Sequence, residues 1–154
     1  GGAFIGVADD ATAVVWNPAG LTQIEKPEAS FVMRFVGNSW KTTNGTNKNE
    51  LTENHFLLNF LSTSYPLQAG NKPVVGSIAV QNQLDMNYED DNEKDKGGGS
   101  TLTLGISSQI VPLISLGATA NIWYGKWTQT TTNPNRTESE AKFSGFNIGT
   151  GLMF

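Results

Sequence analysis

The sequence predicts an all-β fold, namely an antiparallel up-and-down β-barrel of the outer-membrane type. About six of its strands lie in this chain, preceded by a short helical hatch. Three observations predict this fold. Apolar and polar residues alternate over long stretches, long and short connections alternate along the chain, and aromatic residues gather near the strand ends. Only 16% of the 154 residues are charged, against roughly 25% in typical soluble domains.

The composition also excludes several classes of function. The net charge is −4 and the ten basic residues are scattered, so the sequence does not predict nucleic-acid binding. The absence of Cys excludes disulfides, thiolate metal sites and cysteine nucleophiles. No run of apolar residues is long enough for a transmembrane helix. The sequence therefore predicts neither an enzyme nor a metal or cofactor site.

Residues 1–27 form the first predicted unit, a compact segment of short helices. Asp9 or Asp10 can cap a helical turn that runs through residues 11–16. Pro18 ends this turn, because proline lacks the backbone donor and biases Asn17 away from helical dihedral angles. This segment is the predicted hatch.

Residues 28–154 form the second unit, the strands. Alternation sustained over ten or more residues is a strong strand signal, and it recurs in residues 78–88, 102–110, 114–124 and 146–154. Two earlier strands, about 28–40 and 53–66, alternate less cleanly. In the second of them Phe56, Leu58 and Phe60 are expected on one face.

The connections predict how these strands are arranged. Polar loops are expected at about 41–52, 89–99 and 129–139, with short turns at 67–72 and 111–113. In an up-and-down sheet this order places all the long loops at one end, as in outer-membrane barrels. The aromatic residues near strand ends fit the interfacial girdles of such barrels; they are Trp40, Tyr65, Tyr88, Tyr124, Trp127 and Phe143. A soluble antiparallel β-sandwich is the alternative.

Six strands are too few to close a membrane barrel, for which about eight is the minimum. Open strand edges in lipid would leave backbone groups without hydrogen bonds. We therefore expect the N-terminal part of a longer protein, or, as the alternative, several copies that share one barrel.

Residues 7–21 carry the most specific motif and read VADDATAVVWNPAGL. This run resembles the N-terminal signature of the FadL/TodX family of outer-membrane long-chain fatty-acid and hydrocarbon transporters. The similarity covers about residues 1–36, and beyond them only the rhythm of strands and loops agrees. Related families with the same opening include barrels that serve protein secretion.

The resemblance implies a fourteen-stranded barrel plugged by an N-terminal hatch. Substrate would leave sideways through a kink in the third strand, here within about residues 73–88, where Gly76 and Asn82 are the candidates for the opening. The resemblance implies gating rather than catalytic roles for the hatch positions, which are Asp9, Asp10, Asn17, Pro18, Ala19 and Gly20.

The expected function is thus passive transport of a long-chain fatty acid or another hydrophobic small molecule across the bacterial outer membrane. Membrane lipid and lipopolysaccharide are the expected surroundings. A scaffold or shuttle in protein secretion is the first alternative, and a soluble β-sandwich binding module is the second.

Three further signals favour structural roles. His55, the only histidine, has no nucleophile motif beside it and is expected to be structural. The acidic run 90–95 lacks the spacing of a calcium loop, and the glycines at 97–99 lack the Lys-Ser/Thr of a phosphate loop.

Overall fold

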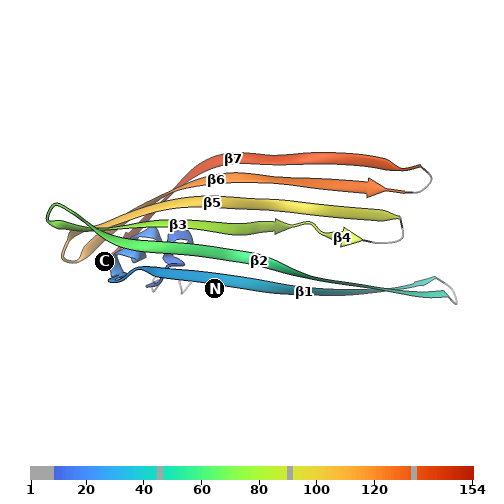
Figure 1. Ribbon diagram of the computed structural model, residues 1–154, viewed down its shortest axis with the longest axis horizontal. Helices are drawn as coiled ribbons and strands as arrows, with labels where there is room; N and C mark the ends of the chain where they lie inside the picture. Colours follow the sequence, from blue (N-terminus) through green and yellow to red (C-terminus); the bar gives the residue numbers. More distant parts are fainter. Residues whose placement is uncertain (1–8, 45–46, 90–91, 133–134) are drawn as a thin grey trace.

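The computed structural model describes residues 9–44, 47–89, 92–132 and 135–154, which form one antiparallel sheet with two short helices on one face (Figure 1). The helices are α1 (Ala13–Trp16) and the 3₁₀ helix η2 (Pro18–Gln23). The strands are β1 (Glu28–Asn44), β2 (Asn47–Ala69), β3 (Lys72–Asp85), β4 (Tyr88–Glu89), β5 (Glu93–Val111), β6 (Ile114–Thr131) and β7 (Thr137–Met153).

The strands follow one another in an up-and-down order. Their order in the sheet is β1-β2-β3-β5-β6-β7, and the two-residue β4 pairs with β5. The β2–β3 and β5–β6 turns lie at one end of the sheet, and β1 with β2, β4 with β5, and β6 with β7 come together toward the opposite end (Figure 1). The predicted all-β antiparallel fold is confirmed. The sheet is not closed, and β1 and β7 are its edges.

The three long polar loops predicted at 41–52, 89–99 and 129–139 are wrong in extent. Most of these residues continue the strands, and β1 and β2 stay paired as far as Asn44 and Asn47. Threonine-rich segments favour extended backbone. Opposite charges across the hairpin also help, since Lys41 lies opposite Glu50 with its Nζ 3.3 Å from Oε1.

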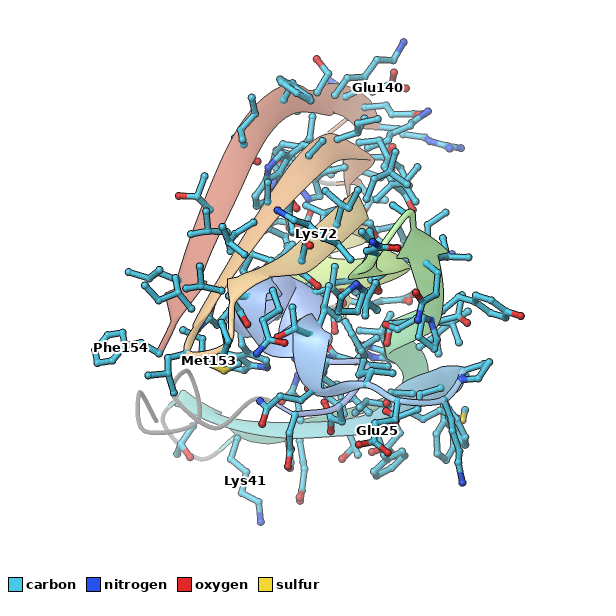
Figure 2. All side chains as sticks on the ribbon, turned by 90° about the vertical axis from the view of Figure 1, so that its left-hand side faces the viewer. Glu25, Lys41, Lys72, Glu140, Met153 and Phe154 are labelled. Carbon is cyan, nitrogen blue, oxygen red and sulfur yellow. The ribbon has the colours of Figure 1, made fainter. Side chains whose placement is uncertain are left out.

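The sheet is curved, and the N-terminal segment (residues 9–27) lies in its hollow (Figure 2). We call the face that carries this segment the concave face. On β5 the concave-face side chains of Thr101 and Thr103 are 3% and 2% exposed, whereas Leu104 and Ile106 on the convex face are 45% and 57% exposed. Other large apolar side chains exposed on the convex face are Phe31, Met33, Phe35, Phe56, Leu58, Leu116, Ile122, Phe146, Ile148 and Leu152.

The expectation that Phe60 shares a face with Phe56 and Leu58 is wrong. Val32 pairs with Phe60 and Met33 pairs with Leu58, so that Asn59 is an extra residue in β2. Such a β-bulge reverses the alternation beyond it. Phe56 is accordingly 73% exposed, whereas Phe60 is 5% exposed.

The hydrophobic core lies between the N-terminal segment and the sheet. Val14, Leu21 and Ile24 of the segment pack with Phe60 of β2 and Val75 of β3. Around this small core the buried positions of the sheet carry hydroxyl groups instead; they are Ser62, Ser64, Thr101, Thr103, Ser107, Ser115 and Thr119. The concave face is therefore covered but largely polar.

Candidate functional site

Asn17 connects the two helices of the N-terminal segment to β7. Its Oδ1 accepts a hydrogen bond from the backbone N of Ala19 at 3.2 Å, which caps η2, and its Nδ2 donates to the Leu152 carbonyl at 3.2 Å. The side chain is 8% exposed. Pro18 follows at the first position of η2, where a missing N–H is tolerated. The Gly20 N–H donates to the Asn17 carbonyl.

This turn packs directly against two glycines of the sheet. Gly117 of β6 and Gly151 of β7 are directly paired, and they lie beneath residues 17–19. A Cβ atom at Gly117 would lie 2.2 Å from the Pro18 carbonyl carbon, and one at Gly151 would lie 2.1 Å from Asn17 Oδ1. Only glycine therefore permits the observed contact.

Asp10 starts the helical turn, in keeping with the predicted cap. Its Oδ1 accepts from the Thr12 N–H at 2.8 Å and from Thr12 Oγ1 at 2.5 Å. Asp9 is exposed and precedes this turn. The gating roles predicted for both carboxylates stay predictions, and residues 1–8 of the predicted hatch lie outside the described residues.

Hydroxyl groups fix the rest of the N-terminal segment. Ser62 Oγ of β2 donates to the Ala11 carbonyl at 2.8 Å. Thr22 Oγ1 is 2.9 Å from Ser115 Oγ of β6. Because β2, β6 and β7 all hold the segment, its position depends on the curvature of the whole sheet.

A second feature is the separation of β2 from β3. Their pairing runs from Ala69–Lys72 to Phe60–Gln81, and among the described residues it does not continue beyond. Beyond this point β2 remains paired with β1, and β3 remains paired with β5. Figure 1 shows the β1–β2 hairpin diverging from β3 and β4.

Three titratable side chains meet across this separation. Asp85 Oδ2 of β3 lies 3.1 Å from Arg34 Nη2 of β1 and 2.9 Å from His55 Nε2 of β2. Together with Asn87 they line an open cavity of about 460 Å³. We call Arg34, His55 and Asp85 the charged cluster.

Asp85 is the last residue of β3 and pairs with Gly98, which in turn pairs with Lys126. Burial by itself raises the pKa of Asp85. Hydrogen bonds from His55 and Asn87 act in the opposite direction and outweigh it, so the pKa is lowered below the usual aspartate value. The carboxylate is thus held in its charged form.

The two residues predicted at a lateral opening lie apart. Gly76 lies within uninterrupted pairing, with Tyr65 on one side and Ile106 on the other. Asn82 lies at an irregularity, because the pairing with β5 shifts between Asn82 and Leu84. The irregularity is next to the point where β2 and β3 separate. Its role in substrate exit stays a prediction.

The sequence favours structural roles for three features, namely His55, the glycines at 97–99 and the acidic run 90–95. His55 contacts Asp85 as described, and the described side chains that line the cavity beside them include no serine. Gly97 and Gly98 lie within β5 rather than in a loop, both with positive φ. Asp90 and Asp91 of the acidic run lie outside the described residues. Within the described part of the chain, no group of three or more His, Cys, Asp or Glu side chains could hold a metal ion.

Sequence reasoning missed the charged cluster and the glycine pair. Arg34 and Asp85 are 51 positions apart in the sequence, and only the register of β1, β2 and β3 brings them together. The one available signal was Arg34 itself, a charged residue in the otherwise uncharged run 29–40.

The fold and the site together define an open antiparallel sheet whose concave face holds an irregular N-terminal segment and whose convex face is apolar. Comparison with protein-family models, with characterised proteins and with solved structures gave no match. No helix in the described residues has the length and hydropathy to cross a membrane.

Proposed function

We propose that this chain forms part of an outer-membrane β-barrel that passes long-chain fatty acids or other hydrophobic small molecules across the membrane without energy input. In this proposal residues 1–27 are the hatch. The convex face contacts membrane lipid, and the polar hairpin ends face the lipopolysaccharide. Further strands are needed to close the barrel.

The observation that carries the proposal is the distribution of side chains over the two faces of the sheet. Rows of large apolar side chains such as Ile106 and Ile148 are exposed on the convex face, whereas hydroxyl groups are buried beneath the N-terminal segment. Burying one such side chain is favourable by about 1.5–3 kcal/mol. Exposing this convex face to water is therefore strongly unfavourable, whereas contact with lipid would not carry this cost. All the described strands lie in one sheet, so no second sheet covers this face as in a β-sandwich.

Two features support passage through the barrel. The segment in the hollow is held by a small core and by a few side-chain hydrogen bonds, namely those of Asn17, Thr22 and Ser62, and a segment with few contacts of this kind opens locally more easily than the rest of a fold. The separation of β2 from β3 next to Asn82 provides a place where a hydrophobic molecule can leave sideways.

The test is the uptake of radiolabelled oleate by cells with and without the intact gene. We expect uptake only with the gene, and an altered rate when Asn17 and Pro18 are both replaced by Ala, with the barrel still assembled in the outer membrane. Unchanged uptake, together with mislocalised secreted proteins on deletion, would favour the secretion scaffold. Recovery in the aqueous fraction without detergent would favour the soluble module. Loss of assembly in the double variant would remove the support for gating.

A further inference from the structure

A cavity of about 260 Å³ lies between the N-terminal segment and the concave face, and none of its lining residues is charged. It is distinct from the cavity at the charged cluster, with which it shares no lining residue. Its walls combine amides, threonine hydroxyls and two indole rings. The residues that matter here are Gln81, Gln83, Asn121, Asn147, Trp16 and Trp123.

Three of the four amide oxygens in this cavity accept hydrogen bonds from protein donors. Gln83 Nε2 donates to Gln81 Oε1 at 2.8 Å, and Trp123 Nε1 donates to Asn147 Oδ1 at 3.1 Å. Thr103 Oγ1 donates to Asn121 Oδ1 at 2.7 Å. These bonds fix the orientation of the amides.

The same bonds leave donors available in the cavity. Within the described residues, the amide nitrogens of Gln81 and Asn147 donate to no protein acceptor, and Asn121 Nδ2 has only Thr119 Oγ1 at 3.5 Å. These groups come from β3, β6 and β7, and β5, which lies between β3 and β6 in the sheet, adds Thr101 and Thr103 to the same cavity. The cavity therefore presents an oriented set of donors to whatever occupies it.

The chemistry of the wall selects among classes of ligand. A carboxylate would find no cation among the lining residues. An alkyl chain would separate the amides from water without replacing their hydrogen bonds, at a penalty of roughly 1–3 kcal/mol for each group. A hydroxyl group both donates and accepts, and the flat apolar faces of Trp16 and Trp123 suit the C–H face of a ring.

We infer that this cavity binds an uncharged, hydroxyl-rich group about the size of one sugar ring. Its volume of about 260 Å³ is near the lower end of small-molecule sites, roughly 300–1,000 Å³. The group can belong to a free sugar or to the sugar head of an amphiphile, and the same contacts serve both. The inference needs the observed packing of segment and sheet but not transport, so each proposal can fail without the other.

The test uses the intact protein in phosphatidylcholine vesicles and follows tryptophan fluorescence during titration. Methyl β-D-glucoside represents the free sugar, and hexyl β-D-glucoside below its micelle concentration represents the amphiphile. Hexanoate and hexanol are the controls without a sugar ring. Gln81→Met and Asn147→Leu remove amides of the cavity, and Gln68→Met, at an exposed position of β2, is the matched control.

We expect a saturable signal for at least one glucoside, weakened about tenfold in Gln81→Met and in Asn147→Leu but unchanged in Gln68→Met. Binding of both glucosides identifies the free sugar as sufficient, and binding of hexyl glucoside alone identifies the amphiphile. The inference is overturned if neither glucoside saturates, which would leave the cavity to water. It is equally overturned if hexanoate or hexanol binds as well, or if the cavity variants behave like Gln68→Met. An unheated gel confirms that each variant is folded.

Discussion

The fit of the N-terminal segment onto Gly117 and Gly151 gives the sharpest test of the fold. Replacing either glycine by Ala adds one methyl group where none fits. The added Cβ would lie 2.2 Å from the Pro18 carbonyl carbon at position 117, or 2.1 Å from Asn17 Oδ1 at position 151. Non-bonded carbon atoms prefer about 3.5–4.0 Å, so the turn has to lift by about 1 Å or more.

The size of the effect follows from the contacts that this lift breaks. Asn17 Nδ2 loses the Leu152 carbonyl, and Thr22 loses Ser115. Each hydrogen bond contributes about 0.5–1.5 kcal/mol, and the residual crowding costs about 1–3 kcal/mol. Docking of the segment is therefore weakened by at least about 2 kcal/mol, which raises the undocked population about thirtyfold.

The absence of Cys from the chain allows a direct assay. Ala13 is fully buried in the docked segment, so an Ala13→Cys thiol reacts with a maleimide only when the segment opens, and the labelling rate reports the open population. Gly76→Ala is the matched control, since a Cβ atom there meets nothing within 4 Å. We expect labelling of vesicle-embedded protein to accelerate about thirtyfold with Gly117→Ala and to stay unchanged with Gly76→Ala. Equal rates in the two variants would refute the reasoning.

Two further predictions concern the charged cluster and the convex face. Asp85→Asn should lower the free energy of unfolding in urea by about 1–2 kcal/mol at pH 7, allowing for the half-exposed Arg34. Because the pKa of Asp85 is lowered in the folded protein, the stability lost in Asp85→Asn is lost in full above the usual aspartate pKa. The difference in free energy of unfolding disappears as the pH falls through the lowered pKa. A difference that persists in acid would contradict a stabilising role of the Asp85 carboxylate. Ile148→Arg should make the free energy of folding into vesicles less favourable by about 2–4 kcal/mol. Asn147→Arg, on the concave face, should have a smaller effect on the same free energy. Equal yields on unheated gels would argue against a lipid-facing surface.

The strands from residue 78 onward could be predicted because their alternation is long. In β5, β6 and β7 the predicted apolar face is the exposed convex face, with Leu104, Leu116 and Ile148 as examples. The helical start was also predictable, since Asp10 and Pro18 have local chemistry that needs no partner elsewhere. Both successes rest on rules that act within one segment.

The failures arise where one residue changes the relation between segments. An extra residue at Asn59 moves Phe60 from the convex to the concave face, and no local preference of Asn59 announces it. The charged cluster depends in the same way on where the β2–β3 pairing stops. The predicted polar loops are wrong for the opposite reason: polarity alone does not indicate irregular backbone, because polar hairpins can continue as paired strands beyond the rest of the sheet.

Alternation alone does not indicate which face of a sheet is covered. The type of polar residue on each face does indicate it. A face exposed to water normally carries Lys, Glu, Arg or Asp. Residues 97–125 contain none of these, so neither face of β5 and β6 is built for water over that length. Where the N-terminal segment lies on them, the polar face of β5 and β6 carries the small residues Thr, Ser and Gly, and Gly105 and Gly117 are two points of close approach. All the described strands lie in a single sheet, so no second sheet covers the apolar face, and in the proposed function this face lies against the lipid bilayer.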